Sequence, residues 1–267
     1  MYLGGFLISV IFCLGAFIFL RTIFAATTTT VPTQMQVISS GANQAPTVTS
    51  VAISPTPQIT LTSNTTTSVY VTAIIDDTNG CSDFLPPSGS STILLYRAGI
   101  TSSTCLTTQN NLNCYRATDF TATSSCISST QINTTTTFQV WYFADATDSS
   151  SSYSSQNWKA TVIVRDSANA TGTGDSPGVQ MNTLNAINVT TSSINYGTIA
   201  ASSTSGSTNQ VATTSNAGNS STTLQFRALQ TLVSGSNSIS TGSQRYSTSS
   251  FTFPGTSTAL TDSLVTV

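Results

Sequence analysis

The chain has 267 residues, enough for about two domains, but only 6% of them are charged and the net charge is −2. It contains 51 Thr and 44 Ser but no Glu and no His, and Lys159 is its one lysine. This composition excludes Ser-His-Asp catalysis and His-based zinc hydrolases, and it lacks the basic cluster that nucleic-acid binding needs.

The residues that usually form the solvent face of a helix, Glu, Lys, Gln and Arg, are scarce in this chain. Thr, Val, Ile, Tyr and Phe instead favour a pleated sheet, where a Thr methyl can pack while its hydroxyl stays in water. We therefore expect an all-β protein that is not an enzyme and needs no cofactor, with Ca²⁺ as the one exception considered below.

Residues 1–25 carry the first element, an uncharged apolar stretch from Leu3 to Leu20 that is followed by Arg21. Its length is at the lower edge of a membrane span, and Ala25 or Ala26 would suit signal peptidase. The stretch predicts a hydrophobic helix that is either a cleaved signal peptide or an uncleaved membrane anchor. Both readings place the rest of the chain outside the cytoplasm, and residues 26–49 read as a Ser/Thr/Pro-rich linker.

Residues 50–180 show the alternation of half-buried strands. Val69, Val71, Ala73 and Ile75 share one face, and a second strand begins at Trp158. In that second strand Trp158, Ala160, Val162 and Val164 are expected to point inward, and Lys159, Thr161 and Arg165 outward. The spacing of such strands between Gly, Pro, Asn and Ser turns indicates a β-sandwich. Trp141 and Trp158 are expected in its core, with an exposed sugar-stacking Trp as the alternative.

Four cysteines lie in this region, at Cys81, Cys105, Cys114 and Cys126. In an exported chain an even number indicates two disulfides, and three pairings are open. We favour Cys105–Cys114 nested inside Cys81–Cys126, because a pair nine residues apart can close a hairpin-like loop. A four-thiolate zinc site is the competing reading, although no CxxC pair is present.

Asp and Asn residues form two sets that could bind Ca²⁺ in an exported protein. The first set is Asp76, Asp77, Asn79 and Asp83, and the second consists of Asp145 and Asp148 together with Asp166. The spacing does not match an EF-hand loop, and Asp and Asn also cap turns. Both the calcium hypothesis and the turn hypothesis stay open at this point.

Residues 181–267 are expected to form a second, smaller domain. Asn216-Ala217-Gly218-Asn219 reads as a turn between two strands. Leu224, Phe226 and Ala228 share a face, and a core completed by C-terminal apolar residues is predicted: Phe251, Phe253, Val265 and Val267.

Two stretches resemble known surface proteins. "INYGTIAASSTS…NQVATTSNAGNSSTTLQFRA" resembles the small immunoglobulin-like repeats of microbial surface proteins. "YFADATD…NWKATVIVRDSA", with the cysteine loop, resembles uncharacterised exported envelope proteins of bacteria and archaea that carry the same pair of modules. The resemblance covers residues 75–230 and implies two immunoglobulin-like β-sandwich domains in tandem after the N-terminal helix. It implies an extracellular setting and no catalytic residues.

These observations predict a non-catalytic structural protein of the cell envelope or surface. The alternative is an adhesin or carbohydrate-binding module, with Ca²⁺ assisting, whose partner would be a surface glycan or protein. Five N-x-[ST] sequons mark surface positions if the host glycosylates them: Asn64, Asn133, Asn169, Asn188 and Asn219.

Overall fold

The computed structural model describes residues 42–83, 89–120 and 125–267. The predicted helix of residues 1–25 and most of the 26–49 linker lie outside these residues. In the part of the chain that is described, no helix has the length and apolarity needed to cross a membrane.

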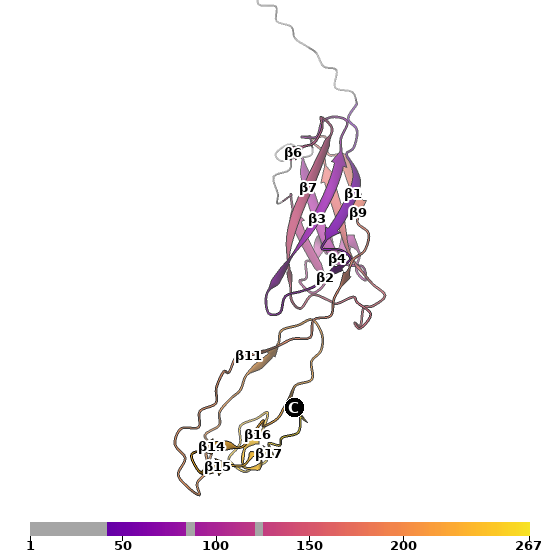
Figure 1. The fold of residues 1–267 in the computed structure, drawn as a ribbon. Coiled ribbons are helices and arrows are strands. Elements are labelled where there is room, and N and C mark those ends of the chain that lie inside the picture. Colours follow the sequence, from indigo (N-terminus) through magenta and orange to yellow (C-terminus); the bar gives the residue numbers. More distant parts are fainter. Residues whose placement is uncertain (1–41, 84–88, 121–124) are drawn as a thin grey trace, which may run out of the picture. The chain divides into compact units, whose positions relative to one another are not determined.

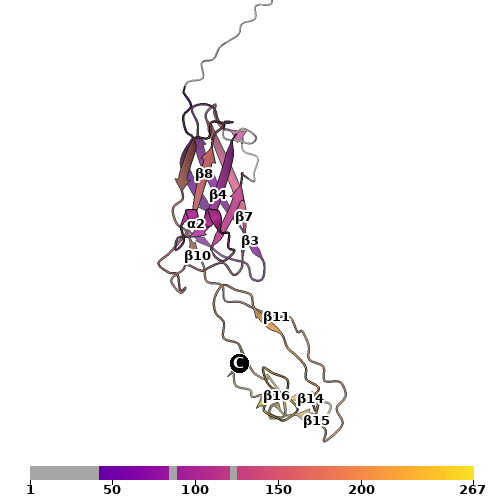
Figure 2. The same cartoon turned by 180° about the vertical axis from the view of Figure 1, so that it is seen from behind.

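Two four-stranded antiparallel sheets pack face to face, as Figures 1 and 2 show from opposite sides. The order in the first sheet is β1-β3-β7-β6, and in the second it is β5-β4-β8-β9. The strands of the first sheet are β1 (Thr47–Ser54), β3 (Thr66–Asp76), β7 (Gln131–Trp141) and β6 (Ser125–Cys126). Those of the second are β5 (Cys114–Thr118), β4 (Ser90–Arg97), β8 (Trp158–Arg165) and β9 (Thr171–Asp175). The β-sandwich predicted for this region is thus present.

The core between the sheets is built from the alternating apolar residues of the long strands. Val69, Val71, Ala73 and Ile75 of β3 are all buried, while Tyr70 on the opposite face of the strand is exposed. From the facing sheet, β8 buries the side chains of Trp158, Ala160, Val162 and Val164, as its sequence predicts. A short parallel pair, β2 (Gln58–Ile59) with β10 (Gln180–Met181), adds Ile59 and Met181 to this core.

The outer face of β4 and β8 is also covered, which alternation alone does not predict. The six-residue helix α2 (Ser102–Thr107) lies over it (Figure 2), capped by the Thr101 hydroxyl, which accepts from the Thr104 N–H. Leu94 and Tyr96 form a second buried cluster there with Cys105 and Cys114. Thr161 lies on this outer face, as predicted, but it is not exposed to solvent. Its side chain is buried, and its hydroxyl lies 3.0 Å from the Tyr96 hydroxyl.

Two disulfides join the cysteines in the nested arrangement that the sequence favours, Cys81–Cys126 and Cys105–Cys114. The four-thiolate zinc reading is therefore wrong. The first bond ties the loop after β3 to β6, and the second ties α2 to β5. In the chain-entropy description, sequence separations of 45 and 9 residues correspond to about 4 and about 2.6 kcal/mol of stabilisation.

The two tryptophans differ from the expectation that both lie in the core. Trp158 is fully buried and donates its indole N–H to the carbonyl of Asp145, 2.9 Å away. Trp141 is 39% exposed and stacks on Phe143, with ring centroids 5.7 Å apart. The reason is the alternation of β7, which turns Phe138 and Val140 inward and therefore places Trp141 on the outside.

Residues 187–267 form four two-stranded ribbons and a 3-10 turn, η1 (Thr241–Ser243). The ribbons pair β11 (Ile187–Val189) with β12 (Thr214–Asn216), β13 (Gln225–Phe226) with β18 (Val265–Thr266), β14 (Leu232–Ser234) with β15 (Asn237–Ile239), and β16 (Arg245–Tyr246) with β17 (Thr258–Ala259). The second sandwich predicted for 181–267 is not confirmed by these short strands.

Few side chains of these ribbons are buried. Ala217, Ala228 and Ser257 are buried, whereas the predicted core residues Phe251, Phe253 and Val265 are only half-buried. Twelve large apolar side chains are exposed: Ile187, Val189, Ile194, Tyr196, Ile199, Val211, Leu229, Leu232, Val233, Ile239, Leu264 and Val267. Strands of two or three residues are too short to present the continuous apolar face that a sandwich requires.

The turn from Asn216 to Asn219 is the best-packed part of this region. Its backbone bonds to the segment after β10, with Ala217 N donating to Ala186 O at 2.9 Å and Asn219 N to Leu184 O at 3.0 Å. A Cβ at Gly218 would lie 2.0 Å from the Leu184 carbonyl oxygen, so only glycine fits there. The predicted turn is present, and it is held by the segment that leaves the sandwich.

Candidate functional site

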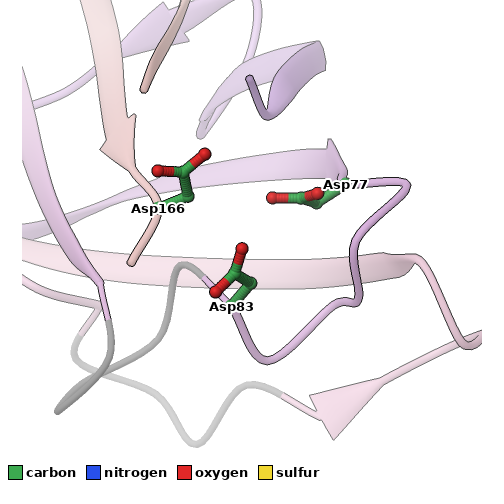
Figure 3. Close-up of side chains that lie close together, drawn as sticks. All are labelled: Asp77, Asp83 and Asp166. Atoms are coloured by element: carbon green, nitrogen blue, oxygen red, sulfur yellow. The ribbon is translucent and has the colours of Figure 1, made fainter. Parts of the chain in front are cut away.

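Three carboxylates converge in the loops after β3 and β8, which belong to opposite sheets. Asp77 directly follows β3, Asp166 directly follows β8, and Asp83 lies further along the loop after β3. Oxygens of all three lie within 4.8 Å of one another. Figure 3 shows the three carboxyl groups turned toward a common space.

Local hydrogen bonds hold each of these loops. In the loop after β3, Gly80 N donates to Asp77 O at 3.1 Å and Asp83 N to Gly80 O at 3.0 Å, and Gly80 has a φ of 136°, which favours glycine. In the loop after β8, Asp166 Oδ1 accepts from Ala170 N at 2.8 Å. The Cys81–Cys126 disulfide fixes the first loop between Asp77 and Asp83.

The carboxylates are poorly solvated. Asp77 and Asp166 are only 1% and 2% exposed, and Asp83 is half-buried. Asp77 Oδ1 accepts from the Asn79 N–H at 2.8 Å, but its Oδ2 has no hydrogen-bond partner among the described residues. Burial raises the pKa of Asp77 above its usual range, with a smaller contribution from the charges of Asp83 and Asp166, while the Asn79 N–H acts in the opposite direction.

The sequence grouped these residues differently. Of the first predicted calcium set, Asp77 and Asp83 come together, and Asp166 joins them from the second set. Asp76 instead accepts from the Gln131 side-chain amide at 2.9 Å, and the Asn79 side-chain oxygen accepts from Gln44 N at 2.7 Å. Asp76 and Asn79 are therefore engaged in hydrogen bonds to residues distant in the sequence, and neither joins the cluster.

The remaining members of the second set, Asp145 and Asp148, do not belong to the cluster, and their assignment as calcium ligands is not supported. Asp145 forms a 2.8 Å ion pair with Arg97, whose guanidinium also lies 3.8 Å from the centre of the Tyr153 ring. Asp148 accepts from the backbone and hydroxyl of Thr183, at 2.7 and 2.6 Å. Burial opposes ionisation of Asp148, but the hydrogen bonds from Thr183 and Ser150 outweigh it and lower its pKa.

The five sequons occupy different environments. Asn64, Asn133 and Asn169 are exposed, and Asn188 is half-buried. Asn219 is the exception, because its amide nitrogen already donates to Ala144 O and Asn182 O, at 3.0 and 3.1 Å. A glycan on that nitrogen could not keep both hydrogen bonds, so Asn219 is a poor acceptor in this fold.

Comparison with known proteins identified no relative: no protein-family model matches the chain, and neither does any curated protein or solved structure. The functional argument therefore rests on the structure of the sandwich itself.

Proposed function

We propose that this chain is a non-catalytic structural protein of the cell envelope or surface, exported through its N-terminal segment. The observation that carries this proposal is the presence of two disulfides in the sandwich, Cys81–Cys126 and Cys105–Cys114. Disulfides form and persist outside the reducing cytosol, and small exported domains use them to supplement a limited core.

The strand order supports an immunoglobulin-like sandwich. The orders β1-β3-β7-β6 and β5-β4-β8-β9 correspond to strands A-B-E-D and C′-C-F-G of that fold, in the same chain order. Such sandwiches present loops at both ends and serve in many cell-surface proteins as spacers and binding modules. For residues 181–267 the sequence resemblance alone motivates a second module, because the short strands described there do not enclose a core of their own.

The charged groups also support a structural role. Buried Arg97 and half-buried Asp145 pair with each other, and Arg97 also contacts Gln156 and Tyr153, which suits a contact that fixes loops rather than one that reacts. With neither His nor Glu in the sequence, general acid–base chemistry would depend on Asp, Tyr and the single Lys159.

Surface exposure and oxidation state test this proposal together. On intact cells of the source organism, we expect added protease to remove the protein, and thiol reagents to label the four cysteines of the sandwich only after reduction. Mass spectrometry of the native protein would report N-terminal processing, both disulfides and glycans in one measurement. Recovery from the cytosol with free thiols at Cys81, Cys105, Cys114 and Cys126 would contradict the proposal.

A second candidate function is carbohydrate binding, which the exposed Trp141 favours. Its ring stacks on Phe143 at an interplanar angle of 12°, and flat aromatic surfaces of this kind can stack on the apolar face of a sugar. On a glycan array we would expect specific binding that Trp141→Ala abolishes and that Tyr70→Ala, a change at another exposed aromatic residue, leaves intact. If no glycan on the array is bound specifically, the carbohydrate-binding function is rejected and only the structural role is retained.

A further inference from the structure

The carboxylate cluster of Asp77, Asp83 and Asp166 lacks the partners that buried charges require. Buried carboxylates in folded proteins are paired with cations, hydrogen-bonded at each oxygen or bound to metal ions. Among the described residues, no Lys or Arg forms an ion pair with any of the three. Asp77 Oδ2 is buried and accepts no hydrogen bond from the described residues. Figure 3 shows the Asp77 carboxyl group turned toward Asp166 and Asp83.

Four of the other carboxylate oxygens of the cluster accept hydrogen bonds that orient them. Asn79 N holds Asp77 Oδ1, Ala170 N holds Asp166 Oδ1, and the Asn43 amide donates to Asp166 Oδ2 at 2.8 Å. The Ser167 hydroxyl donates to Asp83 Oδ1. Each bonded oxygen retains a second lone pair, so these contacts fix the carboxylates without using up their capacity as ligands.

We propose that Asp77, Asp83 and Asp166 form a binding site for one Ca²⁺ ion. Three carboxylate oxygens are hard ligands, which excludes the softer metals that prefer nitrogen or sulfur. Ca²⁺ holds oxygens at about 2.3–2.6 Å, so ligands separated by up to 4.8 Å can share one ion. Mg²⁺ requires about 2.0–2.1 Å and nearly ideal octahedral geometry, which three residues from two loops satisfy less easily.

The position of the site gives the ion a structural consequence. Asn43 and Gln44 lie in the segment that precedes β1, and they contact Asp166 and Asn79 respectively. Ca²⁺ bound between the loops after β3 and β8 would therefore tie together the two sheets and the segment that enters the first of them. Bound Ca²⁺ would stiffen this end of the sandwich, where the predicted linker ends.

Calcium titration of the EDTA-treated full chain tests the site. By isothermal titration calorimetry we expect one Ca²⁺ per chain, with a dissociation constant of about 0.1–1 mM, the range typical of extracellular modules. Asp77→Asn and Asp166→Asn should each weaken binding at least tenfold. Asp262→Asn makes the same chemical change at an exposed position in the ribbons and should leave binding unchanged.

Thermal unfolding separates loss of a ligand from loss of the fold. Ca²⁺ should raise the unfolding midpoint of the wild type and of Asp262→Asn, but not that of Asp77→Asn. Without Ca²⁺, Asp77→Asn should unfold at or above the wild-type midpoint, because it removes a buried charge beside two others. If Asp77→Asn fails to fold, Asp83→Asn provides the same comparison from a half-buried position.

Three results would overturn the proposal: no binding to the wild type up to 10 mM Ca²⁺ (about tenfold above the expected range), unchanged affinity in the Asp77 and Asp166 variants, or tighter binding of Mg²⁺ than of Ca²⁺. Limited proteolysis adds a structural readout. Cleavage near Asn43 and Gln44 should slow when Ca²⁺ is added to the wild type and stay unchanged in Asp77→Asn.

Discussion

The sandwich of residues 47–181 and the ribbons of residues 187–267 are built from similar Ser/Thr-rich alternating sequence, yet they pack very differently. The strands β3 and β7 each have eleven residues. β7 buries every residue of one face and β3 buries four successive residues of one face, whereas no strand after Met181 exceeds three residues. The sandwich holds nearly all the buried apolar side chains, and the ribbons expose twelve large ones.

Strand length accounts for this difference. A strand of eight to eleven residues places four or five side chains on one face, and two such sheets can enclose a core. Strands of two or three residues place one or two, so their apolar residues stay in contact with water unless another chain covers them. We therefore expect the free energy of unfolding to reside in the sandwich.

Reduction of both disulfides should produce the largest difference between the two regions. All four bonded cysteines lie in the sandwich, and the chain-entropy values of about 4 and about 2.6 kcal/mol are a large share of a typical domain stability of 5–15 kcal/mol. With reductant, hydrogen exchange should accelerate throughout β3, β4, β7 and β8. Equal exchange before and after reduction would contradict the stabilising role of the bonds.

A matched pair of leucines tests the core directly. Leu95→Ala removes a fully buried side chain between the sheets and should cost about 2–5 kcal/mol, whereas Leu229 is 81% exposed and Leu229→Ala should change stability by less than about 0.5 kcal/mol. Denaturant unfolding followed by the fluorescence of buried Trp158 measures both. Equal destabilisation would show that the ribbons share in the cooperative core.

Much of the sandwich could be predicted because its signals are local. The alternation in β3 and β8 identifies the buried face residue by residue, and the alternation in β7 also indicates that Trp141 faces outward. The short separation of Cys105 and Cys114 favours the nested disulfides but does not exclude the other two pairings. The helix α2 could not be found in this way, because its six residues are too few for a helical period.

The sequence predicts only part of the candidate site, because the position of Asp166 in it depends on the topology of the sheets. Asp77 and Asp83 are six residues apart, so one loop brings them together, but Asp166 lies eighty-three residues beyond Asp83. The three meet only because β3 and β8 end at the same end of the sandwich in different sheets. The usable signal was that Asp77 follows the apolar alternation ending at Ile75 by two residues and that Asp166 directly follows the predicted strand from Trp158 to Arg165.

A smaller effect is expected at the contact between the two regions, where Ala217 and Asn219 hydrogen-bond to the segment after β10. Gly218→Ala should break this contact. A Cβ there overlaps the Leu184 carbonyl oxygen, so we expect the turn of Asn216–Asn219 to be destabilised by about 1–3 kcal/mol. Hydrogen exchange at the Ala217 and Asn219 amides should become about 5- to 150-fold faster.

A glycine in an open position provides the control for that change. A Cβ at Gly242, in η1, would meet nothing within 4 Å, so Gly242→Ala should leave exchange at Ala217 and Asn219 unaltered. Exchange in β3 and β7 should be unaffected by either substitution, which would show that the sandwich is stable without this contact. Faster exchange across β3 in Gly218→Ala would instead mean that the turn supports the sandwich itself.

The last prediction concerns Tyr115 in β5, whose ionisation lowers the stability of the sandwich only at alkaline pH. Its hydroxyl donates to Asn111 O at 2.6 Å and accepts from Trp141 N at 3.0 Å, and burial raises its pKa to about 12. The pKa is about 10 in the unfolded chain, so the neutral phenol contributes stability that is fully present below pH 10 and is lost as the pH rises toward 12. Ultraviolet titration should show one tyrosine ionising near pH 12, a phase that Tyr115→Phe removes and that Tyr196→Phe, a change at an exposed tyrosine of the ribbons, retains. Persistence of that phase in Tyr115→Phe would place the late-ionising tyrosine elsewhere and remove this distinction between the two regions.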